Sequence, residues 1–297
     1  MDKVDMAIVR YLLRNSRLSY RELADRLNLS VNAVHKRIKG LIEDDIIREF
    51  TAKISLQALN AITVMVFGKS GANSLEEVCK KLGEHEAIYW VSFGAGNYTY
   101  IGAFLRELSE LEAFAEHVKE TAQISDLTVG IIHREYSPTN AKLYPLDYKI
   151  IYALHKNSRK PISEVAEELG VSPKTIRRRL SRMIQEGLIE LSIEWSPDTS
   201  NNIIAIFHMS LRDSVDKKKT LSVLSKEYAS NIIFSWYFSN IPRLVLCGIW
   251  TPTLKELAEI AKDMRRKEIF SSVTPQMIYN GYIFDTWRDK LLIEKAQ

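Results

Sequence analysis

Two short stretches of the sequence carry several long cationic side chains and no acidic residue. Residues 30–41 contain three lysines or arginines, and residues 172–183 contain five. Each stretch starts with a serine, a residue type that often caps the N-terminus of a helix. Arginine and lysine reach phosphates and guanine edges, and asparagine can pair with adenine. A helix of this composition can therefore bind DNA, provided that its cationic face is exposed.

Apolar residues recur at helical spacing in both stretches and define an inward face on each helix. These apolar positions are Val34, Ile38 and Leu41 in the first stretch and Ile176, Leu180 and Met183 in the second. The residues predicted to contact DNA are Ser30, Asn32, His35, Lys36, Arg37 and Lys39, followed by Ser172, Lys174, Thr175, Arg177, Arg178, Arg179 and Arg182.

The two stretches occupy equivalent positions in an internal repeat. A constant offset of 142 aligns residues 4–48 with residues 146–190 without a gap, and identical pairs include Asp5/Asp147, Ser16/Ser158 and Arg17/Arg159. A cationic face on a single helix is usually a solvated surface. The same face at the same position of both copies instead favours DNA contact.

Each copy changes its periodicity after about fifty residues. The first fifty predict three short helices with a tight turn before the third, which is typical of a helix-turn-helix. The remainder predicts the order βαββαβ of a ferredoxin-like module. The predicted elements are 61–68, 75–82, 87–93, 98–104, 108–120 and 127–134 in copy one, then 203–211, 217–228, 232–238, 244–250, 254–267, 273–279 and a tail helix at 282–297 in copy two.

We therefore predict an α+β fold of two tandem units, each a (winged) helix-turn-helix followed by a ferredoxin-like βαββαβ module. The predicted domains are a first helix-turn-helix domain at 1–50, module 1 at 51–145, a second helix-turn-helix domain at 146–195, and module 2 with a C-terminal helix at 196–297.

Composition narrows the class of protein. The chain has 297 residues, of which 46% are hydrophobic and 26% charged, which is typical of folded domains and not of a disordered chain. Its net charge is +4, and each helix-turn-helix region contributes +2 (ten Lys/Arg against eight Asp/Glu in 1–50, nine against seven in 146–195). The apolar runs are too short to span a bilayer, and the first residues are charged where a secretory signal is apolar. We expect a cytoplasmic protein without membrane contact.

The residues give no sign of an enzyme. The six histidines show no metal-binding spacing, and the chain has neither a phosphate-binding loop nor a dinucleotide fingerprint. With two cysteines, it also has no disulfide framework and no metal knuckle. We predict no catalytic residue, no metal and no cofactor.

Three short motifs of copy one resemble the leucine-responsive regulator (Lrp/AsnC) family. They are D-x-x-I at 5–8, N-S-R at 15–17 and E-L-A-x-x-L at 22–27, and copy two is similar over 147–189. The resemblance implies an archaeal or bacterial transcriptional regulator that binds specific sequences of double-stranded DNA. It further implies that the βαββαβ modules pair to form a homo-dimer or higher oligomer and sense a small molecule such as an amino acid.

In this family a glycine loop links the middle strands of the sensing module. Copy one retains such a loop, and copy two reads Ser-Asn-Ile-Pro-Arg at 239–243 in its place. The residues that the resemblance implies for ligand binding are Gly94, Gly96, Asn97 and Tyr98.

The sequence leaves three questions open. The two units could pair within one chain, which favours an asymmetric DNA site, or between two chains, which restores a palindrome. The second question is whether the chain is an enzyme, because siroheme decarboxylases are similar in architecture, pairing two such units and using histidine and arginine on an anionic tetrapyrrole. The third question is whether the chain is a degenerate member of the family that serves only as an assembly partner.

Overall fold

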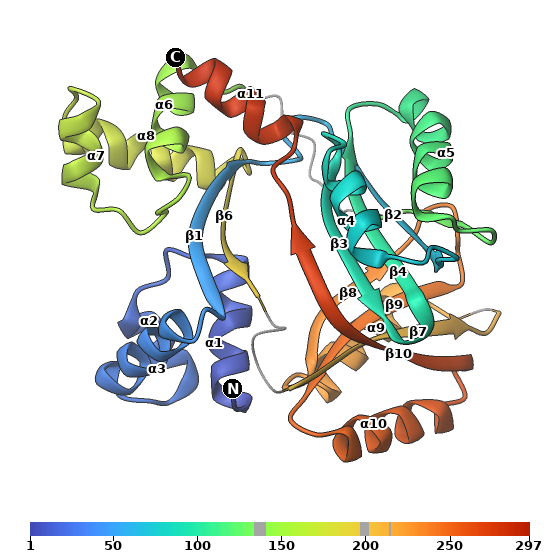
Figure 1. The fold of residues 1–297 in the computed structure, drawn as a ribbon. Helices are drawn as coiled ribbons and strands as arrows, with labels where there is room; N and C mark the ends of the chain where they lie inside the picture. Colours follow the sequence, from blue (N-terminus) through green and yellow to red (C-terminus); the bar gives the residue numbers. More distant parts are fainter. Residues whose placement is uncertain (134–140, 197–201, 214) are drawn as a thin grey trace. The chain divides into compact units, whose positions relative to one another are not determined.

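A computed structural model describes residues 1–133, 141–196, 202–213 and 215–297. The chain forms two compact units, and each unit contains segments from both copies (Figure 1). The helical unit comprises Ala7–Ala61, Glu135–Thr199 and Asp285–Gln297. The sheet unit comprises Met1–Met6, Ile62–Arg134 and Ser200–Phe284. Segments that are distant in sequence therefore build each unit together.

The helical unit contains the three helices predicted in each copy, and each set is followed by a strand. In α2, the side chain of Ser19 accepts from the backbone of Glu22, and the carboxylate of Glu22 accepts from the backbone of Ser19, which fixes the helix start. Asp45 and Gly187 adopt left-handed φ angles of 57° and 66° just after α3 and α8. The elements are α1 (Lys3–Arg14), α2 (Tyr20–Leu27), α3 (Val31–Glu43) and β1 (Ile47–Ile54), then α6 (Pro145–Leu154), α7 (Ile162–Glu168), α8 (Pro173–Gln185) and β6 (Ile189–Trp195).

The strands β1 and β6 pair the two copies within the chain. They run antiparallel, and their register places Phe50 opposite Ile193 and Thr51 opposite Ser192. Because Phe50 and Ser192 are 142 positions apart, as are Thr51 and Ile193, the pairing is symmetric about its centre. The question that the sequence left open is answered in this unit, because one copy pairs with the other.

Reciprocal hydrogen bonds repeat this symmetry at the start of α2 and α7. The hydroxyls of Ser16 and Ser158 lie 2.6 Å apart, and both residues are fully buried. Arg17 donates to the carbonyl oxygens of Ser158 and Lys160, and Arg159 donates to those of Ser16 and Leu18. Each bond of one copy has its counterpart in the other, so the two helix-turn-helix domains are related by a local two-fold axis.

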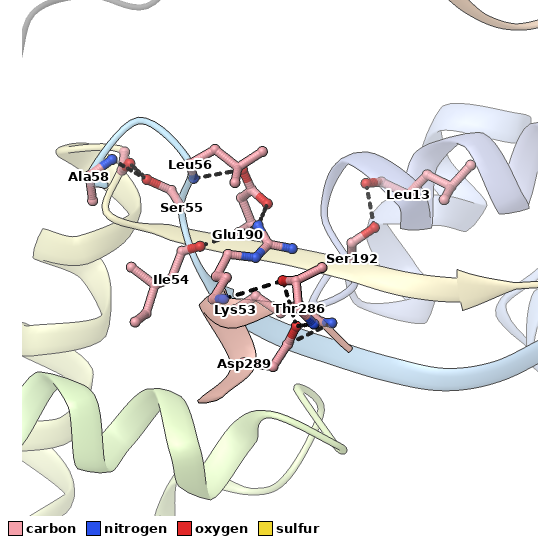
Figure 2. A network of polar contacts seen from close by, with 12 residues as sticks. Leu13, Lys53, Ile54, Ser55, Leu56, Ala58, Glu190, Ser192, Thr286 and Asp289 are labelled. Carbon is pink, nitrogen blue, oxygen red and sulfur yellow. Dashed lines mark hydrogen bonds and ion pairs between the residues drawn. The ribbon is translucent and has the colours of Figure 1, made fainter. Parts of the chain in front are cut away.

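A C-terminal helix, α11 (Trp287–Ala296), completes the helical unit. Leu292 is buried in the core of the second helix-turn-helix. Arg288, only 7% exposed, donates to Glu190 over 2.6 Å and to the carbonyl oxygen of Ile54 over 3.3 Å. Figure 2 shows this network together with the ion pair of Lys53 and Asp289, 2.8 Å long. The helix is thus fixed to both β1 and β6.

In the sheet unit, the two predicted βαββαβ modules form one eight-stranded sheet of order β5-β2-β4-β3-β10-β7-β9-β8. Its edges meet, because Ile132 bridges to Phe238 and the N–H of His133 donates to the carbonyl of Tyr237 over 2.8 Å. The strands are β2 (Ile62–Lys69), β3 (Ile88–Gly94), β4 (Tyr98–Leu105), β5 (Thr128–Ile131), β7 (Ile203–Leu211), β8 (Ile232–Tyr237), β9 (Leu244–Thr251) and β10 (Phe270–Ile283), and the helices are α4 (Leu75–Gly83), α5 (Leu111–Ala122), α9 (Lys217–Glu227) and α10 (Leu254–Arg266), with single 3₁₀ turns η1 (Ala95–Asn97) and η2 (Leu108–Glu110).

Strand alternation gives the sheet two apolar faces. On β7, Phe207 and Met209 pack in a core with residues of α9 and α10, whereas Ile206 faces the opposite side. There Ile206 packs with Phe67 of module 1 and Phe238 of module 2. This second cluster joins the two modules, since its members come from both.

The end of the chain corrects two predicted boundaries. We expected a strand at 273–279 and a helix from residue 282, but β10 spans Phe270–Ile283 and the helix begins at Trp287. The strand is longer because it pairs with β7 up to Ile278 and then with β3 from Ile278 to Ile283. The strand expected at 127–134 is β5, Thr128–Ile131, and position 134 lies outside the described residues.

Candidate nucleic-acid interface

The second helix of each helix-turn-helix begins at a capping serine. The backbone N–H of Ala33 donates to Ser30 Oγ over 3.2 Å, and that of Thr175 donates to Ser172 Oγ over 3.2 Å. The three apolar positions predicted on each helix are buried. Sequence periodicity therefore identified the inward faces of α3 and α8 correctly, and the opposite faces are available to solvent.

The exposed face of α3 combines amide, imidazole and ammonium groups. The ring of Tyr20 meets the ring of His35 edge-on, with 5.1 Å between centroids. Lys39 lies 3.5 Å from Glu43, and both side chains are more than half exposed. Such a pair contributes little to stability, so Lys39 can exchange this partner for a phosphate at little cost. Asn32, His35, Lys36 and Lys39 are exposed, as is Ser30, while Arg37 is half-buried.

The exposed face of α8 is more strongly cationic. It begins with Pro173 in the first turn, where the missing N–H leaves no helical hydrogen bond unmade. Lys174 and the neighbouring pair Arg177 and Arg178 follow. Arginine is the side chain that most often contacts guanine in the major groove. Ser172, Lys174, Arg177 and Arg178 are exposed, whereas Thr175, Arg179 and Arg182 are half-buried.

Two of the arginines predicted to contact DNA bind a buried carboxylate. Asp147, at the start of α6, is fully buried. Its Oδ1 lies 3.1 Å from Arg179 Nη1, and its Oδ2 lies 2.6 Å from Arg182 Nη2. The N–H of Tyr144 also donates to this carboxylate, over 2.8 Å. Arg182, which we expected to point outward, thus fixes α8 to α6 together with Arg179.

Sequence reasoning missed the role of Asp147, although a signal was present. An aspartate occupies the same position in both copies, as Asp5 and Asp147. In each copy it is the third residue of the helix. The spacing of Arg179 and Arg182 places both on one side of α8. A buried acid with two cations at helical spacing indicates a bond between helices.

Close packing and backbone conformation explain the glycines in the loop that links β3 and β4 of copy one. A Cβ on Gly94 would lie 2.6 Å from the carbonyl oxygen of Met277, which is on the paired strand β10. Gly96 and Asn97 have left-handed φ angles of 71° and 62°. Tyr98 is half-buried, with its ring centroid 5.5 Å from that of His208. The loop lies at the end of β3, beside β10.

Replacing Gly94 by alanine is expected to destabilise the sheet unit by about 2 kcal/mol, because the new methyl group would overlap the β10 backbone. Chemical denaturation measures this change. In Gly40→Ala the methyl group meets nothing within 4 Å, so this variant should be no less stable than the parent. Equal stability of Gly94→Ala and the parent would contradict the close approach.

A half-buried histidine joins the two modules, and sequence reasoning assigned it no role. His208 Nε2 on β7 lies 2.5 Å from the hydroxyl of Tyr100 on β4. Burial lowers the pKa of His208 to about 4 and raises the pKa of Tyr100. The surrounding rings of Phe67 and Tyr98 are uncharged. His208 is therefore neutral at physiological pH.

The pKa of His208 predicts a loss of stability in acid. The unfolded chain binds a proton near pH 6.5, whereas the folded chain does so only near pH 4. Unfolding is therefore favoured as the pH falls through this window, by about 3 kcal/mol in total. Urea denaturation of the parent and of His208→Gln, which keeps a hydrogen-bonding group but does not titrate, measures the difference. If both show the same pH dependence, the assignment to His208 is wrong.

None of the helices described is long and apolar enough to cross a membrane. Among the described residues, no three histidine, cysteine or acidic side chains are grouped so that they could hold a metal ion.

The duplicated capped helices with exposed cationic faces define a DNA-binding protein with two helix-turn-helix domains. A family model described as winged helix-turn-helix DNA-binding matches residues 1–48 and 145–190. An uncharacterized HTH-type transcriptional regulator of Pyrococcus furiosus is 32% identical over 136 residues, which cover 44% of this chain and 92% of that protein. The chain belongs to these HTH-type transcriptional regulators, and its two copies make it about twice as long as that relative.

Solved structures give two further comparisons. The siroheme decarboxylase NirDL, crystallised with an iron-uroporphyrin III analogue, covers 100% of both chains with a TM-score of 0.61 and 15% identity. This likeness shows that the whole two-copy fold exists elsewhere. AsnC of Escherichia coli covers 50% of this chain and 99% of its own, with a TM-score of 0.40 and 22% identity.

Proposed function

We propose that this transcriptional regulator reads its operator with the exposed faces of α3 and α8, placed in successive major grooves. The observation that carries the proposal is the cationic face that occurs on both capped helices, with no acidic residue within 30–41 or 172–183. Their serine caps and helix N-termini lie where a backbone phosphate can bind. In helix-turn-helix complexes the second helix enters the major groove, and paired motifs read half-sites about 34 Å apart.

The residues of each helix divide into two roles under this proposal. Asn32, His35, Lys36 and Lys39 of α3 and Lys174, Thr175, Arg177 and Arg178 of α8 contact bases and phosphates. Arg179 and Arg182 act through Asp147 and hold α8 in position. Arg37, the counterpart of Arg179, is half-buried and is assigned to positioning as well.

The regulator is further proposed to act in the cytoplasm and to respond to a small molecule such as an amino acid. The resemblance to the family motivates the effector, and Gly94, Gly96, Asn97 and Tyr98 are its candidate contacts. The close approach of Gly94 to β10 and the left-handed φ angle of Gly96 already explain why these two positions are glycines, and no ligand is needed for that explanation. Asn97 and Tyr98 are therefore the residues to test. We propose no cofactor and no catalytic residue for this function.

DNA selection from a randomised duplex library tests the proposal. The expected result is an enriched sequence that binds at least about 10³-fold more tightly than random duplex, with an affinity that falls steeply as salt rises. Binding that is weak and independent of sequence would overturn the proposal, because a generic basic surface gives only that. Thermal-shift assays with the common amino acids then test the effector.

A decarboxylase is the second candidate function, and the full-length fold similarity to NirDL favours it. His208 lies on the same face of β7 as Ile206, beside the rings of Phe67 and Tyr98, and histidine is a residue type that such enzymes are expected to use. Incubation with siroheme followed by mass spectrometry tests this candidate. Loss of carboxyl groups as carbon dioxide, abolished in His208→Gln, would establish it, and an unchanged tetrapyrrole would exclude it.

A further inference from the structure

The local two-fold axis of the helical unit places α3 and α8 at equivalent positions. The axis is defined by the symmetric β1–β6 register and by the reciprocal bonds of Arg17 and Arg159. The capping bonds at Ser30 and Ser172 have equal lengths, so the two helices also begin in the same way. Residues 142 positions apart therefore occupy matching places on the two exposed faces.

The side chains at these matching places differ in chemistry. Asn32 of α3 corresponds to Lys174 of α8, and His35 corresponds to Arg177. In both pairs, α8 carries a long cationic side chain where α3 carries a shorter one. Two further exposed pairs are Lys36 with Arg178 and Lys39 with Ser181.

This difference changes which bases each helix can read. Arg177 and Arg178 can each donate two hydrogen bonds to O6 and N7 of a guanine. Asn32 can instead form a bidentate pair with adenine, and His35 is oriented by the edge of Tyr20. Lysine provides a point charge without the planar fork of arginine, so Lys36 is not equivalent to Arg178.

We propose that a single chain recognises a non-palindromic duplex, with a guanine-containing half-site under α8 and a different, adenine-containing half-site under α3. The inference rests on the proposed reading role of these helices. It adds that both half-sites are read by one chain, that the site has a direction, and that Arg177 and Arg178 determine which end is which. Because α3 and α8 lie at equivalent positions but carry different side chains, a palindromic duplex cannot match both helices at once.

Exchange of the reading residues tests the proposal. The variant Asn32→Lys/His35→Arg/Lys36→Arg gives α3 the cationic residues of α8 at these three exposed positions. The parent and this variant are compared on three duplexes of equal length: the selected site, a palindrome of its α8 half, and a palindrome of its α3 half. The parent is expected to bind the selected site at least about tenfold more tightly than either palindrome. The variant is expected to prefer the α8 palindrome.

A matched control separates base reading from added charge. Glu112→Gln/Glu120→Gln on α5 raises the net charge by the same two units at exposed positions outside the helix-turn-helix domains, and it should keep the preference of the parent. Circular dichroism and thermal denaturation confirm that each variant is folded. A parent that binds a palindrome as tightly as its selected site, or that needs two chains per duplex in native mass spectrometry, would overturn the inference while leaving the DNA-binding function intact. Failure to bind any duplex sequence-specifically would instead overturn the proposed function itself.

Directed DNA cleavage tests the direction of the site. Lys39 and Ser181 are matching exposed positions near the end of each helix, and the native Cys79 and Cys247 are buried. An iron chelate attached to Ser181→Cys should cut the half that contains guanine, and one attached to Lys39→Cys should cut the other half. Cleavage of both halves from either position would show that the chain binds in both orientations and would contradict the proposed polarity.

Discussion

Arg177→Ala/Arg178→Ala is expected to weaken specific DNA binding by about 10²-fold or more. Each bidentate contact to guanine contributes about 1–3 kcal/mol of discrimination, and both side chains are exposed on α8. The slope of log affinity against log salt should also flatten by one to two units if the guanidinium groups displace counterions. Fluorescence anisotropy with a labelled duplex, measured at several salt concentrations, gives both quantities.

The control for this prediction removes the same charge elsewhere. Lys226→Ala/Lys262→Ala changes two exposed lysines of α9 and α10, outside the helix-turn-helix domains. It should leave the specific affinity within about threefold of the parent value. Lys36→Ala/Lys39→Ala should in turn reduce binding and show that α3 also contacts the duplex. If the α8 double variant binds as the control does, α8 is not a reading helix.

Asp147→Ala is expected to destabilise the second helix-turn-helix domain by about 3 kcal/mol. The substitution leaves Arg179 and Arg182 without their buried partner and removes the carboxylate that accepts from the N–H of Tyr144. Both guanidinium groups are about one quarter exposed, so water recovers part of the lost interaction. Chemical denaturation gives the free-energy change.

Asp147→Asn distinguishes the contribution of charge from that of the helix cap. Asparagine retains an oxygen that can accept from the backbone, but it carries no charge for the two arginines. Its stability should therefore lie between those of the parent and Asp147→Ala. A parent-like stability for Asp147→Ala would mean that Arg179 and Arg182 do not depend on this carboxylate for their position.

The parts of the fold that depend on local pattern could be predicted from the sequence. Helical spacing placed Val34 and Ile176 inward on α3 and α8, and the capping serines marked where both helices begin. The constant offset of 142 identified the duplication, because aligning the two copies requires no knowledge of the three-dimensional structure. Each of these inferences needed only a short window of sequence.

Interactions between distant residues could not be predicted in the same way. The bond from Arg182 to Asp147 spans 35 positions, and a helical wheel of α8 alone shows Arg182 as solvent-facing. The extension of β10 depends on its pairing with β3, which belongs to the other copy. Pairing of the copies within one chain likewise depends on contacts such as Ser16 with Ser158, whose existence no single segment reveals.

The pairing of β1 with β6 also affects how DNA occupancy responds to the amount of protein. A regulator assembled from two separate subunits loses its paired form on dilution, so its occupancy falls more steeply than its total concentration. Here both partners belong to one polypeptide, and each faces the other at an effective concentration that dilution does not change. For a site read by one chain, occupancy then follows a simple saturation curve, and halving the protein level at low occupancy halves the fraction of operators bound.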